Sequence, residues 1–210
     1  MNVLIACEIS GLIRDAFRRR GHEAWSCDLL DIGDCPPHWP PQEFPNYHLQ
    51  GDALAFLYTG AFKPWDLLIA MPPCTYLSNS GVQWLYKKGT REHNLERWKN
   101  LHAGAKLFRA LYNAAVPRIA VENPIMHGFA KELVGVEPTQ YVQPYEFGHN
   151  ETKKTGLWLR NLPKLVPTKL IPPPYVHRVH KMGPGPWRQA ERSLTYKGIA
   201  EAMAEQWGSP

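Results

Sequence analysis

The chain has 210 residues, of which 44% are hydrophobic and 20% are charged, a composition typical of globular proteins long enough to bury a core. No apolar run approaches the length of a membrane span, and the N-terminal stretch lacks the charged region that opens a signal peptide. We therefore expect a cytoplasmic protein without membrane contact, built as one domain or as one domain with an added segment.

The formal net charge of +5 is compatible with a polyanionic partner. The four cysteines are scattered along the chain, which indicates reduced thiols rather than a disulfide framework. Cys27 and Cys35, taken with His38 and His48, match no zinc-binding spacing, so we expect no metal site.

The first predicted elements are a strand over residues 2–7 and a helix over 12–20, joined by the turn Glu8-Ile9-Ser10-Gly11. Leucine, isoleucine, alanine and phenylalanine recur at helical spacing on one side of this helix. We expect its arginines, Arg14 among them, to face elsewhere. Gly21 is expected to cap the helix.

A second strand is predicted over 23–27 and ends at Asp28. A strand, a small-residue turn, a helix and a strand ending in an acid form the first half of a nucleotide-binding α/β unit. A carboxylate in this place can accept hydrogen bonds from both hydroxyls of a ribose. Because the turn has a single glycine before the helix, a cofactor without a pyrophosphate fits better.

Residues 29–50 are rich in proline and histidine and are expected to form a loop. A short helix is predicted over 54–58, and Asp52 precedes it. Two roles for Asp52 stand equally. Its carboxylate can accept a hydrogen bond from the amine edge of a base, or it can cap the helix.

A short apolar run over 65–71 has the length of a buried strand and stops at Pro72 and Pro73. Proline fixes its own φ and donates no hydrogen bond, so the strand must end there. Cys74 is thereby placed on a stiff turn outside the carboxyl end of the strand, where open α/β sheets bind their ligands. Its thiol is either a nucleophile or an inert buried cysteine, and position alone leaves the two equal.

The stretch 75–92 is polar, basic and hinged by glycine. Its polar and cationic side chains include Ser78, Lys87, Lys88 and Arg91. We interpret it as a mobile loop able to close over a phosphate backbone, or as an ordinary solvated surface loop.

The best helix pattern of the chain covers 95–115, and a buried strand follows over 118–124. Glu122 and Asn123 end this strand and should lie at the same sheet edge as Cys74. A carboxyl group beside a thiol in that crevice is a catalytic arrangement.

The shorter elements that complete the chain are predicted over 127–134 and 197–207 as helices, and over 140–145 and 156–159 as strands. A polar, cationic turn occupies 148–155. Residues 161–190 are basic and rich in proline, and the prolines clustered over 163–186 predict loop or extended chain in that stretch and no helices. Together the elements predict an α/β fold with a mostly parallel sheet and helices on both faces.

These segments resemble the DNA cytosine-C5 methyltransferase family, whose motifs occur in the same order. Pro72-Pro73-Cys74 with Ser78 matches its nucleophile motif, and Val121-Glu122-Asn123 matches its Glu-Asn motif. Ile9-Ser10-Gly11, Asp28 and Gly51-Asp52 resemble its cofactor-binding segments. Lys153 and Lys154 stand where the family has an arginine-rich motif, and the last helix resembles its closing motif.

The resemblance implies a Rossmann-like enzyme that moves a methyl group from S-adenosylmethionine to C5 of cytosine in DNA, with S-adenosylhomocysteine as product. Cys74 would add to C6 and Glu122 would grip the flipped base. The catalytic set would be Cys74, Glu122, Asn123, Lys153 and Lys154. The cofactor would contact Cys7, Glu8, Ile9, Ser10, Gly11, Asp28, Leu29, Asp52, Ala53 and Pro72. DNA would contact Ser78, Lys87, Lys88 and Arg91.

The chain departs from the family at Glu8 and Ser10, where glycines are usual, and in lacking the usual target-recognition domain. Residues 1–160 and 191–210 would form the catalytic domain, with 161–190 in place of that recognition domain. Small phage and bacterial members, of the kind met in restriction-modification, are the nearest comparison. The expected partner is DNA, duplex or single-stranded, and a protein partner or an oligomer can supply the specificity.

Two other functions stay open. In the first, Cys74 acts as the same nucleophile, but the substrate is a free deoxycytidine nucleotide or the transferred group is hydroxymethyl. The missing recognition domain motivates this alternative. The second is a degenerate methyltransferase fold that binds DNA and has no catalytic activity. Cys74 and Glu122 speak against it, because binding alone needs neither.

Overall fold

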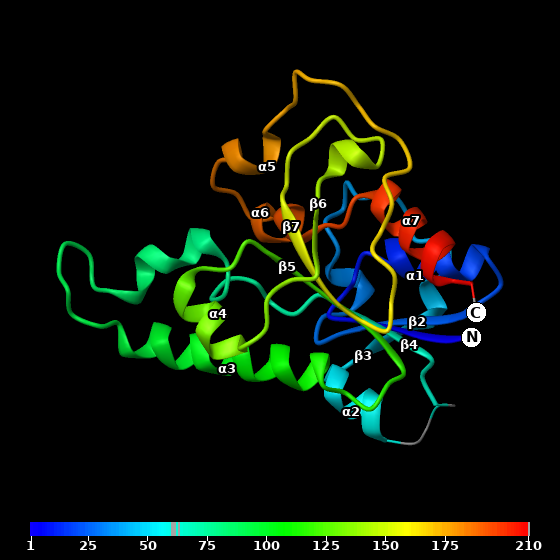
Figure 1. Ribbon diagram of the computed structural model, residues 1–210, viewed down its shortest axis with the longest axis horizontal. Helices are drawn as coiled ribbons and strands as arrows, with labels where there is room; N and C mark the ends of the chain where they lie inside the picture. Colours follow the sequence, from blue (N-terminus) through cyan, green and yellow to red (C-terminus); the bar gives the residue numbers. More distant parts are fainter. Residues whose placement is uncertain (60–61, 63, 210) are drawn as a thin grey trace.

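The computed structural model describes residues 1–59, 62 and 64–209. A seven-stranded sheet with the order β3-β2-β1-β4-β5-β7-β6 runs through the molecule, and helices lie on both of its faces (Figure 1). The predicted α/β class with a mostly parallel sheet is confirmed.

The first half of the sheet consists of parallel strands: β1 (Asn2–Ala6), β2 (Glu23–Asp28), β3 (His48–Gln50) and β4 (Leu67–Ala70). The helices α1 (Leu12–Arg19) and α2 (Ala53–Tyr58) lie between them in the chain. Because β1 pairs with β2 on one side and with β4 on the other, the strand order switches there. Such a switch opens a crevice outside the carboxyl ends of the strands.

The second half of the sheet contains the antiparallel strand pairs. The helix α3 (Leu95–Tyr112) leads to β5 (Arg118–Pro124), which continues the parallel sheet beside β4. After α4 (Gly128–Val134), the chain forms β6 (Gln140–Val142) and β7 (Thr155–Arg160). β7 inserts antiparallel between β5 and β6, and α7 (Lys197–Trp207) ends the fold.

Alternation along the strands builds a core on each face of the sheet. Leu4, Leu68 and Val121 point toward Phe108 of α3, while Val3 and Leu67 belong to the core that contains the residues of α1 and α7. α1 packs against α7, and α3 packs against α4. The pairs lie on opposite sides in Figure 1.

Several sequence-based boundaries were wrong. The stretch 29–50 was predicted as loop but contains β3, because three residues are too few for an alternating pattern to show. The predicted non-helical stretch 163–186 contains α5 (Arg178–Lys181), which falls in a segment without proline, so the breaker signal was spread too widely. The helix α6 (Arg188–Ser193) lies just beyond that stretch and was not predicted.

Arg14 was also predicted wrongly. Its side chain does not face solvent but is completely buried, with 0% exposed. Burial is possible because Asp15, Ser26 and Gln42 bind the guanidinium group, so the charge is paired and hydrogen-bonded. The partner residue Gln42 is distant in sequence, which is why helical periodicity did not reveal this position.

The two chain ends lie side by side (Figure 1). Arg118, at the start of β5, donates to the carbonyl oxygens of Trp207 (3.3 Å) and Ser209 (3.1 Å), and its guanidinium group also contacts the sulfur of Met1 at 2.8 Å. In the part of the chain described, no helix is long and apolar enough to cross a membrane. All four cysteines are free, as predicted.

Candidate active site

The Pro-Pro-Cys turn leaves β4 at its carboxyl end, as predicted. The carbonyl oxygen of Cys74 accepts hydrogen bonds from the backbone N–H groups of Leu77 (3.1 Å) and Ser78 (2.8 Å). These bonds close a tight turn, so the thiol is held at the crevice on a stiff segment. Cys74 is half-buried, whereas Pro72 beneath it is buried.

Glu122 and Asn123 reach the same edge from the neighbouring strand. The register pairs Ala70 of β4 with Val121 of β5, so Glu122 lies just beyond the end of β4. Asn123 is fully buried and donates from Nδ2 to the carbonyl oxygen of Pro124 at 2.6 Å, while its Oδ1 has no partner among the described residues.

Lys153 completes this group from the segment that precedes β7. Its Nζ donates to the carbonyl oxygen of Leu194 at 3.1 Å. Glu122 and Lys153 line a cavity of about 20 Å³ together with Met71, Thr155 and Tyr196. A space of this size holds about one water molecule.

The three side chains influence each other's ionisation. Desolvation raises the pKa of Cys74, and the nearby Glu122 carboxylate raises it further, while Lys153 and Arg192 oppose the shift. Desolvation also raises the pKa of Glu122, against the field of Lys153 and a hydrogen bond with Thr155. Burial lowers the pKa of Lys153, and the negative groups beside it counteract this. Thiol, carboxyl and amine therefore share one desolvated site.

Two of the predicted site residues are not brought to this group. Lys154 is exposed, and its Nζ lies 4.6 Å from the centre of the Tyr141 ring. Ser78 is buried, and its hydroxyl is 3.1 Å from that of Ser80, so this structure does not present it to DNA.

Residues that sequence reasoning missed include Arg192, Thr155 and Tyr196. Arg192 lies on α6, a helix that the sequence did not predict, and its charge acts on both Cys74 and Lys153. The hydrogen bond from Lys153 to the carbonyl oxygen of Leu194, at the end of α6, holds this helix near the thiol. A lone arginine in a basic stretch gave no signal of this placement.

The predicted cofactor residues gather at the carboxyl ends of β1, β2 and β3. Cys7 adopts a left-handed backbone with φ of 60°, a strained conformation that is found mainly at functional sites. The pKa of its thiol is raised by burial and by Cys27, and then by the carboxylates of Asp28 and Asp52. The two acids therefore flank one place at the sheet edge.

Asp28 and Asp52 each fix a turn with one oxygen. Oδ1 of Asp28 accepts from the N–H of Leu30 at 3.0 Å, and Oδ1 of Asp52 accepts from the N–H of Leu54 at 2.9 Å. Asp52 is the N-cap of α2, so the capping alternative is confirmed. The remaining members of the predicted set follow these positions: Leu29 is exposed, and Ala53 is buried.

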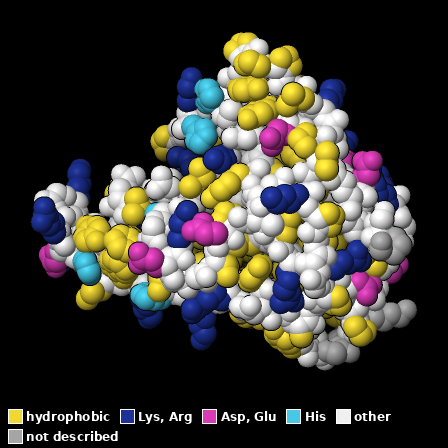
Figure 2. Space-filling view, in the orientation of Figure 1, with side chains coloured by type: hydrophobic (Ala, Val, Ile, Leu, Met, Phe, Trp, Pro, Cys, Tyr) yellow, Lys and Arg dark blue, Asp and Glu magenta, His cyan; other side chains and the backbone are white. Residues whose placement is uncertain are grey.

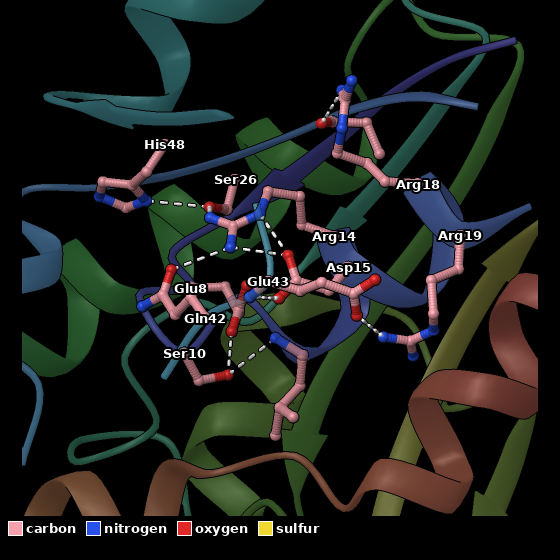
Figure 3. Close-up of polar contacts among 12 residues, drawn as sticks. Glu8, Ser10, Arg14, Asp15, Arg18, Arg19, Ser26, Gln42, Glu43 and His48 are labelled. Carbon is pink, nitrogen blue, oxygen red and sulfur yellow. Dashed lines mark hydrogen bonds and ion pairs between the residues drawn. The ribbon is translucent and has the colours of Figure 1, made fainter. Parts of the chain in front are cut away.

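The turn between β1 and α1 is held by a polar network (Figure 3). Gly11 has φ of 73°, and a Cβ atom there would come within 2.3 Å of the Arg14 guanidinium group, so only glycine fits. Gln42 binds Arg14 through Oε1 and donates from Nε2 to the carbonyl oxygen of Ile9 at 2.6 Å. Loop, helix and turn are thus tied together.

The side chains considered for a metal serve other contacts. Cys35 lies 3.4 Å from the carbonyl oxygen of Ile9, His38 contacts Glu191 at 2.7 Å, and His48 contacts Ser26 at 2.9 Å. No group of three metal-binding side chains occurs within residues 1–59, 62 and 64–209.

Residues 79–93 form an arm that projects at the left of Figure 1, with the short helical turn η3 (Asn79–Leu85) at its base. Lys87, Lys88 and Arg91 are exposed on it and line an open hollow of about 700 Å³. Trp84, 54% exposed, lines the same hollow. Basic side chains are visible on the arm in Figure 2.

No protein-family model and no curated protein matches the sequence. Among solved structures, the Entamoeba histolytica methyltransferase EhMeth is similar, with a TM-score of 0.51 and 14% identity over 81% of this chain and 57% of that one. An E. coli protein named as a prophage-encoded DNA modification methyltransferase has a TM-score of 0.47 and 14% identity, covering 82% and 52%. The chain thus spans little more than half the length of either. At this identity the similarity to EhMeth shows a shared α/β fold and nothing finer.

Proposed function

We propose that the protein transfers a methyl group from S-adenosylmethionine to C5 of cytosine in DNA. The observation that carries this proposal is the shared site of Cys74, Glu122 and Lys153 at the carboxyl ends of neighbouring strands. A thiol beside a proton-holding carboxyl group and a cation is suited to nucleophilic attack on a ring that must accept a proton.

In the proposed reaction, Sγ of Cys74 bonds to C6 of cytosine and loses its proton, while Glu122 gives a proton to ring nitrogen N3. This addition makes C5 electron-rich, so C5 can take the methyl group. N3 then returns its proton to Glu122 and a water molecule takes the C5 proton. The bond between Sγ and C6 breaks at the same time, which releases 5-methylcytosine and the thiolate of Cys74. The raised pKa of Glu122 supports the donor role, because it favours the protonated form of the carboxyl group. Lys153 favours the thiolate.

The residues at the ends of β1 and β2 fit the proposed cofactor. Asp28 offers a carboxylate to the ribose hydroxyls, and the carboxyl group of Glu8 is buried with one oxygen unpartnered, as expected where a cationic group binds. When bound, S-adenosylmethionine would supply an electrophilic methyl group. The chain's own part is to hold and orient it beside the crevice.

The size of the cavity implies that the site opens for substrate. A cytosine ring does not fit into about 20 Å³. The segment that carries Arg192, Thr195 and Tyr196 covers the cavity and would move aside. In our proposal residues 161–190 take the place of a target-recognition domain, and Lys87, Lys88 and Arg91 bind phosphate groups.

The direct test is incubation of the purified protein with labelled S-adenosylmethionine and, separately, duplex DNA, single-stranded DNA and dCMP, followed by nucleoside mass spectrometry. One added methyl group on deoxycytidine in DNA is expected. A gain only in dCMP would move the protein to nucleotide metabolism. Cofactor binding without methylation of any substrate would contradict the proposal.

Cys74→Ser should abolish methyl transfer, because a serine hydroxyl is a far weaker nucleophile toward C6. Its affinity for S-adenosylmethionine should stay within about twofold, since the thiol belongs to the substrate side of the crevice. Turnover and calorimetric binding measure the two effects. Cys35→Ser, which changes a thiol outside the site, is the matched control and should remain active.

A further inference from the structure

Glu8 is held rigidly in the turn after β1. Its backbone N–H donates to the carbonyl oxygen of Cys27 at 3.0 Å, which joins the turn to the end of β2. Its side chain extends toward Ser10 and the start of α1 (Figure 3). The carboxyl group thus lies in the turn between β1 and α1, among the residues that we propose to hold the cofactor.

The carboxyl group of Glu8 is buried without a full set of partners. The residue is 6% exposed. The hydroxyl of Ser10 donates to Oε1, whereas Oε2 is inaccessible to solvent and has no hydrogen-bond partner in the described chain. A buried, unpartnered carboxylate is costly unless a positive group balances it.

Arg14 does not supply that balance. Its Nε and Nη2 atoms lie 2.8 Å and 2.7 Å from Oδ1 of Asp15. Its remaining bonds go to Ser26 at 3.0 Å and Gln42 at 2.9 Å. The buried region therefore holds two acids and one base, so an ionised Glu8 would carry a negative charge that no cation of its own balances.

Protonation is the state that burial favours for Glu8. Desolvation raises the pKa of its carboxyl group and the field of Asp15 adds to this, while Ser10, Arg14 and the backbone N–H of Gly11 oppose it. The other titratable groups in reach of its charge are Cys27 on β2 and Cys35 in the following loop, both neutral thiols whose own pKa is raised. No surrounding group compensates the charge fully.

We propose that Glu8 is the counter-ion for a positively charged group of S-adenosylmethionine, and that binding expels the proton from its carboxyl group. This inference rests on the proposed function. It names the residue that makes the site select a cationic ligand, at a position where the related family carries glycine. The ligand offers two such groups, the α-ammonium and the sulfonium.

Isothermal calorimetry in two buffers of equal, mildly acidic pH and different ionisation enthalpy measures the proton count. The wild-type protein should release up to about one proton per bound S-adenosylmethionine. Its affinity should rise with pH through the raised pKa and then level off. Glu8→Gln should bind about 10- to 100-fold more weakly and release no proton.

Two variants separate this role from a structural one. Ser10→Ala keeps the carboxyl group and should still release the proton. Glu132→Gln removes an exposed carboxylate on α4 and should change neither affinity nor proton count. Glu8→Gln should melt no lower than the wild type, because it removes an uncompensated buried acid. If Glu8→Gln melts lower than the wild type, the test depends on the other two proteins. Equal proton release by the wild type and by Ser10→Ala would then support the counter-ion role.

The choice of ligand distinguishes the two cationic groups. Proton release with S-adenosylhomocysteine, which keeps only the ammonium, assigns the partner to that group, whereas release with S-adenosylmethionine alone assigns it to the sulfonium. Release with 5′-methylthioadenosine, which lacks both, would overturn the inference. Binding of S-adenosylmethionine without proton release would overturn it while leaving the proposed function standing. No binding at all would overturn both.

Discussion

Glu8 and Glu122 are two carboxyl groups at the same edge of one sheet, and desolvation raises the pKa of each. Their surroundings differ. Lys153 acts on Glu122 as a nearby cation, and Thr155 is its hydrogen-bond partner, whereas Arg14 is ion-paired with Asp15 rather than with Glu8. The protein thus gives Glu122 a cation of its own, and in our proposal a ligand supplies the cation for Glu8.

The largest expected effect comes from removing the acid that the protein balances itself. Glu122→Gln should lower methyl transfer by about 10²- to 10⁴-fold, because the proton donor to the base is lost. The same change removes the negative charge that an ionised Glu122 places beside Cys74, so the pKa of the thiol should fall and alkylation by iodoacetamide should become faster. Turnover and alkylation rates measure the two. An unchanged alkylation rate would show that the acid and the thiol do not interact.

Arg14→Met tests whether the region around Glu8 depends on the arginine for folding. The variant leaves Asp15 without its cation, so the free energy of unfolding should fall by about 3 kcal/mol. Urea denaturation measures the change. Arg109→Met, on the exposed side of α3, should stay within about 0.5 kcal/mol of the wild type. Equal stability of both variants would mean that the buried ion pair is dispensable.

Lys153→Met sharpens the comparison, because it removes the cation beside Glu122 and leaves both buried carboxyl groups without a cation of their own. Lys153 lowers the pKa of Cys74, so its loss should move the pH at which alkylation begins upward. At a fixed neutral pH the reaction should be about tenfold slower. Lys131→Met, on α4, serves as the control and should leave the profile in place. An unchanged profile would assign the stabilisation of the thiolate to Arg192.

Asp28→Ala extends the comparison to an acid that is only half-buried. We expect S-adenosylmethionine to bind up to about tenfold more weakly, because the ribose hydroxyls would lose the carboxylate that accepts their hydrogen bonds. Calorimetry gives the affinity. Unlike Glu8→Gln, this variant should leave proton release unchanged, and a loss of proton release here would assign the titrating group to Asp28.

The sequence predicted the catalytic edge better than its surroundings. Pro72 and Pro73 mark the end of β4 by their own covalent geometry, and Glu122 follows from the strand pattern of β5, so their meeting required only a parallel pairing. Arg14 was placed on the wrong side because its partners Ser26 and Gln42 are remote in the chain. β3 and α6 depend on tertiary contacts, which local patterns do not contain.

The adjoining chain ends have a consequence for engineering. Arg118 holds residues from both ends at the start of β5, at the amino ends of the parallel strands, whereas Cys74 lies beyond their carboxyl ends. A short linker could join the two chain ends, and new ends could be opened at Gly89 in the exposed arm, giving a circular permutant with the same strand order. Conversely, a recognition module fused to either end of this chain would emerge at the amino ends of the strands and would need a tether long enough to reach the crevice at their carboxyl ends.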